Sequence, residues 1–149
     1  MADRERDGYV LTTDPGRVDV DTVHRWLSQD AYWALGRPRE VVEASVKSCD
    51  VWSVFAPGGD QVGFTRAVSD GLTFAWICDV YVDRAHRGRG IATWLAGEAV
   101  ADLRARGLER LVLATRDAHE VYRRVGFIVP ARPDKYMELV LKDGSAAPS

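Results

Sequence analysis

The sequence lacks the features of secreted, metal-binding and membrane-spanning proteins. It has two cysteines, Cys49 and Cys78, whose spacing fits neither a disulfide framework nor a zinc site. Without such a framework, a reducing cytoplasm is the default location. The first residues carry no apolar stretch of the kind found in a secretory signal, and no apolar run approaches the length of a membrane span. We therefore expect a cytoplasmic protein with no metal and no membrane partner.

A general excess of positive charge is also lacking. Lys and Arg number 20 against 22 Asp and Glu, which gives a net charge of −2 at pH 7. This balance argues against nucleic acid as a partner. With 149 residues and 46% hydrophobic side chains, the chain is long enough for one domain with its own core. The expected organisation is a single domain over residues 1–149, with frayed tails at 1–7 and 143–149.

Hydrophobic spacing and turn residues predict an α+β fold. The expected strands are residues 9–12, 51–56, 61–69, 74–82, 111–114, 127–129 and 136–141. The expected helices begin at Asp19 or Asp21, at 36–38, at Ile91 and near Ala118, and the third stops at Gly107. This order predicts a mixed, mostly antiparallel sheet of about seven strands covered by four helices, with one parallel crossover before residues 111–114.

The most informative segment is the turn between the expected strand 74–82 and the helix that begins at Ile91. Gly88 and Gly90 alternate there with Arg87 and Arg89. The start of a helix presents backbone N–H groups without intrahelical acceptors, and the helix dipole adds to their attraction for anions. Glycine lets a phosphate approach the backbone with no Cβ in the way. The segment 87–93, called the diphosphate loop below, therefore predicts a diphosphate site. The alternative is a charged, flexible turn with no ligand.

Three phosphate-binding motifs compete for this loop. A Walker loop needs Gly-Lys-Ser/Thr after its glycines, and that sequence is absent. A dinucleotide-binding turn needs a third glycine where Thr93 stands, and an acidic residue near the end of the next strand, where residues 111–114 have none. The third motif is Arg-x-x-Gly-x-Ala, which residues 87–92 match directly after a strand that ends Val-Tyr-Val.

With this motif, the strand 79–82 and the segment Ala-His-Glu-Val-Tyr-Arg-Arg-Val-Gly-Phe at 118–127, the chain resembles the GNAT superfamily of acyl-CoA N-acetyltransferases. The resemblance covers about residues 51–141. It implies the fold of that family, acetyl-CoA as cosubstrate, and direct transfer of acetyl to a primary amine. The family's habit suggests a homodimer. Two alternatives stay open: a non-catalytic sensor that binds acyl-CoA, and an acetyltransferase whose acceptor is a protein or peptide.

The resemblance also implies roles for individual residues. The backbone of the diphosphate loop would bind the diphosphate, and the pantetheine arm would lie along the preceding strand. Tyr122 would give a proton to the leaving sulfur, although it could instead be a core tyrosine. Asp79 would accept the proton of the amine or anchor it, although it could instead be a structural residue at a strand end. The expected cofactor-binding residues are Val80, Tyr81, Val82, Arg87, Gly88, Arg89, Gly90, Ile91, Ala92 and Thr93.

Aromatic residues mark the expected acceptor side. Tyr32 and Trp33 lie in the connection between the first two helices, and Trp76 lies on the central strand. With Asp70 and Asp79 nearby, these faces would suit a compact cationic amine of a small molecule through cation–π and charge contacts. The alternatives are that the aromatic side chains are simply core and that the acceptor is a peptide.

Overall fold

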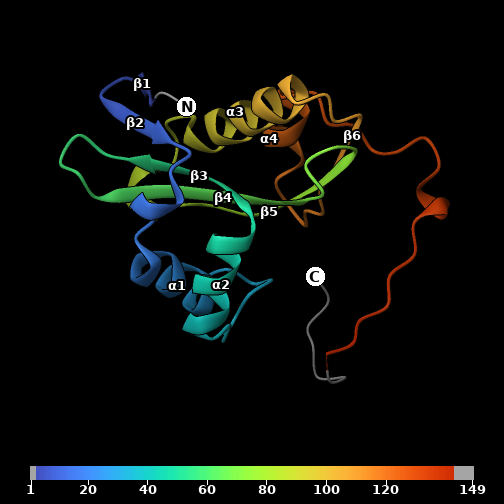
Figure 1. Cartoon of the computed structure of the whole chain (residues 1–149), viewed down its shortest axis with the longest axis horizontal. Helices are drawn as coiled ribbons and strands as arrows, with labels where there is room; N and C mark the ends of the chain where they lie inside the picture. The colour runs from blue at the N-terminus through green and yellow to red at the C-terminus, as the bar shows by residue number, and fades with distance from the viewer. Residues whose placement is uncertain (1–2, 143–149) are drawn as a thin grey trace.

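A six-stranded sheet in the order β1-β2-β3-β4-β5-β6 runs through the centre of the molecule (Figure 1). The structure is a computed structural model that describes residues 3–142. Neighbouring strands are antiparallel except β5 and β6, which are parallel. The strands are β1 (Arg4–Arg6), β2 (Tyr9–Thr12), β3 (Asp50–Phe55), β4 (Gln61–Ser69), β5 (Phe74–Val82) and β6 (Arg110–Val112).

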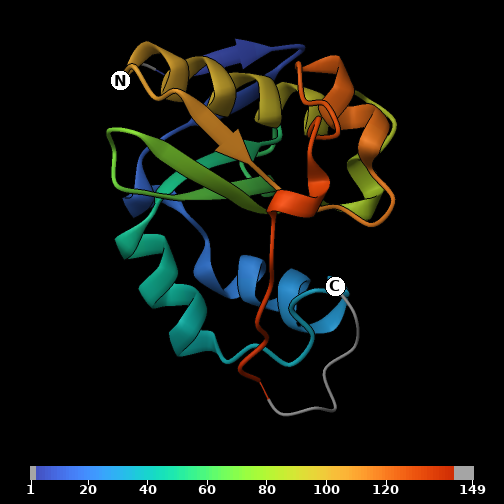
Figure 2. The same cartoon turned by 90° about the vertical axis from the view of Figure 1, so that its right-hand side faces the viewer.

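Helices cover both faces of this sheet, which makes a three-layer sandwich (Figures 1 and 2). The first pair, α1 (Val20–Gln29) and α2 (Arg39–Ser48), lies on one face, and the second pair, α3 (Ile91–Ala105) and α4 (His119–Arg124), lies on the other. The expected fold class, a mixed sheet with four helices, is confirmed. No helix of the described residues is both long and apolar enough to cross a membrane.

Each helical layer buries the apolar stripe that its sequence contains. In α1, the Asp19 side chain caps the helix by accepting the N–H of Thr22 at 3.1 Å, and the side chains of Val23 and Leu27 are buried. In α3, every fourth residue from Ile91 to Leu103 is buried against the opposite face of the sheet. Gly63 in β4 lets α3 come close, because a Cβ there would lie 3.0 Å from Cδ1 of Leu95.

The N-terminal residues form an edge strand, so the expectation of a frayed segment before Gly8 was wrong. Arg4 in β1 is held from the side of α3: its Nη1 donates to Glu98 at 2.7 Å and its Nη2 to Asp102 at 2.8 Å. The Asp102 carboxylate also accepts the indole N–H of Trp52 at 2.8 Å. These contacts join residues that lie far apart in the sequence, which is why local patterns did not predict them. Residues 1–2 lie outside the described residues.

The two strands expected after α4 are absent from the described residues. Because β1 is added to the five expected strands that are present, the sheet has six strands rather than about seven. Only a short 3-10 turn at Pro133–Lys135 interrupts the segment 128–142, called the C-terminal segment below. Its apolar side chains are solvent-exposed, with Met137 97% and Leu139 82% accessible. Figure 1 shows this segment leaving the body of the protein. The expected tail 143–149 lies outside the described residues.

Candidate functional site

The two parallel strands separate soon after they pair. The ladder between β5 and β6 is confined to Phe74–Trp76 on β5 and Arg110–Val112 on β6. Beyond Ile77 the same edge of β5 has no partner strand among the described residues. A cavity of about 980 Å³, called the splay pocket below, opens at this point and is lined from both helical layers. Its size is in the range of small-molecule and cofactor sites.

The diphosphate loop forms one wall of this pocket and has the geometry of an anion site. Gly88 and Gly90 have φ values of +80° and +77°, a backbone conformation that residues with a Cβ rarely adopt. The first helical bond of α3 is donated by Trp94 to the carbonyl of Gly90 at 3.0 Å. Within residues 3–142, no hydrogen-bond acceptor contacts the N–H groups of residues 88–93. A row of unpaired N–H groups at a helix start fits a diphosphate.

The arginines of this region do not all face the loop. The Nε of Arg87 donates to the carbonyl of Val82 at 2.8 Å, and its guanidinium lies 5.1 Å from the Tyr81 ring centroid. Arg84 hydrogen-bonds to Asp30, which also accepts the Tyr81 hydroxyl at 2.5 Å. The hydrogen bond from Arg84 is the main reason that the pKa of Asp30 falls to about 2. Through these contacts, Arg87 and Arg84 stabilise the N-terminal end of the diphosphate loop.

A β-bulge shapes β5 where it enters the pocket. Cys78 pairs with Arg66 and Tyr81 pairs with Phe64, which leaves Asp79 and Val80 together opposite one residue of β4. Asp79 has a φ of +57°, in the left-handed region that aspartate tolerates better than most residues. A bulge of this kind bends a strand and re-aims its side chains and backbone. It sets the course of Val80–Val82 along the splay pocket.

The Asp79 carboxylate is the centre of a buried network. It accepts hydrogen bonds from Trp33 Nε1 at 2.7 Å, Arg37 Nη1 at 2.7 Å and Arg66 Nε at 2.6 Å. Its side chain is 1% exposed. Burial raises the pKa of Asp79, but the charges of Arg66 and Arg37 outweigh this effect and leave it below its ordinary value. This carboxylate is a weaker proton acceptor than a free aspartate, and its contacts favour a structural role at the bulge.

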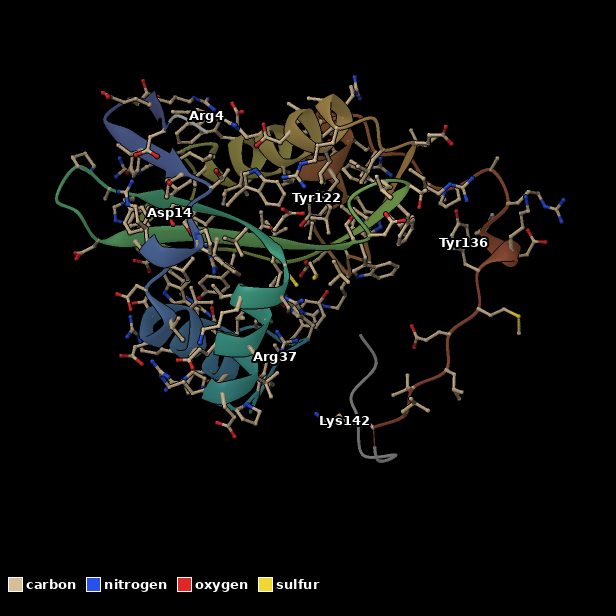
Figure 3. The ribbon with its side chains drawn as sticks, viewed as in Figure 1. Arg4, Asp14, Arg37, Tyr122, Tyr136 and Lys142 are labelled. Carbon is tan, nitrogen blue, oxygen red and sulfur yellow. The ribbon has the colours of Figure 1, made fainter. Side chains whose placement is uncertain are left out.

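Tyr122 projects from α4 into the splay pocket (Figure 3). Its ring meets Phe127 edge-on at a centroid distance of 6.0 Å. Burial raises the pKa of Tyr122 to about 12, with smaller contributions from Tyr32 and Asp117. The hydroxyl therefore stays protonated at neutral pH, and no hydrogen-bond partner contacts it within residues 3–142. Such a hydroxyl can donate to a group bound in the pocket.

The three aromatic residues expected on the acceptor side all line the splay pocket. Trp33 and Trp76 are 37% and 39% exposed, so they are not core side chains. Tyr32 is capped by the guanidinium of Arg116 at 3.7 Å from the ring centroid. The structure does not bring Asp70 to this group, because its carboxylate binds the N–H groups of the β4–β5 turn at 2.9 Å. The expectation of two carboxylates near the aromatic residues was wrong on this point.

Sequence reasoning missed Arg37 and Arg66, which both line the splay pocket beside Asp79. A weak signal for Arg66 was present, because it is the one charged residue in the otherwise uncharged stretch Gln61–Ser69. Arg37 gave no signal, since an arginine before a proline is common on surfaces. Cys78 also borders the pocket, and burial raises its pKa to about 11, so the thiol stays protonated.

Solved structures share this architecture. The structure superimposes with a TM-score of 0.83 on a protein of the GNAT family from Xanthomonas campestris pv. campestris, which is 38% identical and matches over 89% of this chain and 93% of that one. The family model of the Acetyltransferase (GNAT) family matches residues 20–127. The chain therefore belongs to the GNAT family of acetyltransferases, as the resemblance of its motifs implied.

The chain also resembles proteins that are longer than it is, some by sequence and one by fold. Serotonin N-acetyltransferase 2, chloroplastic, from Oryza sativa subsp. japonica is 30% identical over 128 residues, which cover 80% of this chain and 62% of the rice protein. The chain spans between 61% and 64% of the curated relatives that it matches. The Rv2747 protein of Mycobacterium tuberculosis, solved in complex with CoA, shares the fold at a TM-score of 0.64 and 21% identity, over 78% of this chain and 69% of that one.

Proposed function

We propose that the protein transfers an acetyl group from acetyl-CoA directly to a primary amine of a small molecule. One observation carries this proposal: the row of unpaired N–H groups at residues 88–93 opens into the same pocket as the Tyr122 hydroxyl. The first feature suits the diphosphate of CoA, and the second suits a leaving sulfur. Acetyl-CoA supplies the acetyl group as an activated thioester.

Each part of the splay pocket then has a task. The N–H groups of residues 88–93 bind the diphosphate, and the free edge of Val80–Val82 lies beside the pantetheine arm. Arg89 is exposed and has no ion-pair partner within residues 3–142, so it is available for the nucleotide phosphate. Tyr122 holds a proton at its hydroxyl and donates it to the departing thiolate. The attacking nitrogen loses one proton as the amide forms, and water carries this proton to the tyrosinate, which restores the hydroxyl. A Cys78 acyl-enzyme is not needed, because the amine attacks the thioester directly.

The amine must be neutral when it attacks, and the network around Asp79 makes that carboxylate a poor base. A lysine-like amine has a pKa near ~10.4 and is mostly protonated at neutral pH. We propose that the amine loses its proton to water in the wide pocket and that Asp79 acts by holding the bulge. The rate should then rise with pH until the acceptor amine is fully neutral.

Release of free thiol from acetyl-CoA tests the proposal. The protein is assayed with a panel of polyamines, amino acids, aminoglycosides and short peptides, and acetylated products are identified by mass spectrometry. Turnover on a small amine supports the proposal. Binding of acetyl-CoA without turnover on any amine would show a sensor, and turnover on peptides alone would show a peptide acetyltransferase.

We also propose that the protein works as a homodimer through the C-terminal segment. Residues 136–141 are rich in apolar side chains, yet all of them are exposed, and β6 pairs with a strand on one side only. An apolar segment without a partner and an open sheet edge, both within residues 3–142, fit a reciprocal exchange between two copies. Light scattering after gel filtration should give a dimer mass, and the double substitution Met137→Asp, Leu139→Asp should give a monomer. A wild-type monomer would contradict the proposal.

A further inference from the structure

We infer that the acceptor carries a carboxylate beside its amine, as an α-amino acid does, and that Arg37 and Arg66 bind this carboxylate. The inference deepens the proposed function and rests on it, since it concerns the acceptor of the same reaction. It replaces the compact cationic amine that the aromatic residues led us to expect.

The charges of the network around Asp79 do not balance. Two guanidinium groups, those of Arg37 and Arg66, share one carboxylate oxygen, Asp79 Oδ2, at 2.7 and 2.6 Å. The remaining neighbours are uncharged donors or acceptors: the indole N–H of Trp33 on the carboxylate, and the sulfur of Cys49 at 3.4 Å from Arg66 Nη1. A half-buried cluster with one net positive charge is costly, and an anion bound beside it would offset the charge.

Both arginines keep donors that no protein group uses. Within residues 3–142, no acceptor contacts Nε or Nη2 of Arg37, or Nη2 of Arg66. The single buried, unpaired side-chain polar atom of the described residues is Ser53 Oγ, so these nitrogens reach solvent. Both residues line the splay pocket, which is the space that the acceptor would occupy, and their free N–H groups are available to it. Guanidinium groups bind carboxylates better than any other side chain, by paired N–H donors.

The position of Arg37 and Arg66 suits an α-amino acid as the acceptor. Asp79, to which both arginines are bound, is the neighbour in sequence of Val80, where the free edge of β5 runs along the pocket. In an α-amino acid a single carbon separates the amine from the carboxylate. A carboxylate held by Arg37 and Arg66 therefore keeps the amine beside the strand along which the acetyl donor lies. Trp33 and Trp76, both partly exposed on the pocket wall, offer apolar surface to the rest of the acceptor.

The other acids around the pocket give little support to a cationic acceptor. Asp117 faces Arg116 at 3.6 Å, and Asp30 is bound to Arg84. Glu138 also lines the pocket, but it is exposed and belongs to the C-terminal segment. It is the one carboxylate that could attract a cationic amine instead, so it serves as the matched control below.

The test compares acceptors that differ only in the carboxylate. A panel of L-α-amino acids is assayed next to the corresponding carboxamides, with kcat/KM measured for each. We expect the acids to be preferred by about tenfold or more, because a charge-assisted pair of hydrogen bonds is lost in the amide. The amine of a carboxamide is less basic, so the fraction of neutral amine favours the amide and cannot produce this result. Equal rates, or a preference for the amides, would overturn the inference.

Substitutions then locate the effect. Arg37→Gln should bring the acid-to-amide ratio close to one, and Arg37→Lys, which keeps the charge but loses the fork, should retain part of it. Glu138→Gln should leave the ratio within about twofold. A ratio that survives in Arg37→Gln and in Arg66→Gln, or that depends on Glu138 instead, would refute the assignment.

A binding experiment separates this inference from the proposed function. N-acetyl amino acids and their amides are titrated by calorimetry into the protein saturated with CoA. Saturable binding of the acid alone, weakened by Arg37→Gln, supports the subsite even if no amine is ever acetylated. No heat with any N-acetyl amino acid would overturn it, even if another amine is acetylated.

Discussion

One half of the splay pocket consists of backbone groups, and the other half consists of side chains. The half that we propose for the cofactor, called the cofactor half, is backbone: the N–H groups of residues 88–93 and the free edge of Val80–Val82. The acceptor half is made of side chains: Trp33, Arg37 and Arg66 around Asp79. A backbone site depends on fold and glycine alone and tolerates many sequences, whereas a side-chain site changes with each substitution. On the proposed function, recognition of the donor is therefore a property of the fold, and recognition of the acceptor is a property of the individual sequence.

The largest effect should come from breaking the backbone half. Gly90→Glu places a carboxylate among the N–H groups of the diphosphate loop and should weaken CoA binding at least about 100-fold, which corresponds to about 2.8 kcal/mol. Calorimetry with CoA measures the loss. The matched control is Gly71→Glu in the β4–β5 turn, where φ is +78° against +77° at Gly90. It imposes the same backbone strain away from the loop, so equal losses in the two variants would contradict the site.

Next in size is the loss of Tyr122, the side chain that we propose as the proton donor to the departing thiolate. Tyr122→Phe should lower kcat about 100-fold, the lower range for a general acid, with little change in CoA affinity. Tyr32→Phe removes a neighbouring hydroxyl that accepts the N–H of Arg116 at 3.1 Å and should have a far smaller effect. If Tyr122→Phe turns over at the wild-type rate, the tyrosine has no role as an acid.

Removing the charge of Asp79, at the centre of the acceptor half, should lower the stability of the folded protein. Asp79→Asn leaves two half-buried guanidinium groups without a counter-charge and should lower the free energy of unfolding by about 3 kcal/mol, measured by urea denaturation. A base would behave differently: its removal would abolish turnover and alter the pH–rate profile in a protein that is still stable. We expect reduced stability and a pH profile of unchanged shape.

The stability lost in Asp79→Asn should also depend on pH. The pKa of Asp79 in the folded protein lies below its ordinary value of 3.8, so its stabilising effect is fully present above that pH and is lost as pH falls through the folded pKa. The difference in unfolding free energy between wild type and Asp79→Asn should therefore be constant from about pH 5 upward and shrink in more acidic solution. A difference that grows on acidification would mean that the folded pKa is raised.

The smallest effect is expected at Cys78, which borders the acceptor half. Its thiol stays protonated because burial raises its pKa to about 11. Cys78→Ala should change kcat less than about twofold, because a direct transfer needs no thiolate. Acetylated protein trapped in the wild type, and absent in this variant, would show a covalent route instead.

The contrast between the halves also explains how far the sequence could be interpreted. The diphosphate loop was predictable because its strand, glycines and helix start lie within about fifteen consecutive residues. The acceptor network was not, because Asp79 meets Arg66 and Arg37 across separations of 13 and 42 residues and through a bulge. No local pattern announces an aspartate with positive φ.

The errors in the fold have the same origin. The mostly apolar run at 136–141 predicted a strand, yet a strand needs a partner edge, and no such edge is paired with this segment in the described part of the chain. In the opposite direction, the charged residues Arg4–Arg6 were dismissed as a frayed end, although Arg4 has acidic partners on α3 that are more than ninety residues away. Helices α1 and α3 were placed well because their caps and stripes are local.

The lining of the splay pocket comes from both helical layers, α3 and α4 on one side and the α1–α2 connection on the other (Figure 3). On the proposed function, a donor bound beside α3 and an acceptor bound beside the α1–α2 connection can therefore be present together, without either having to depart first. Initial-rate plots at several fixed concentrations of one reactant should intersect, and inhibition by CoA should be competitive toward acetyl-CoA and not toward the amine.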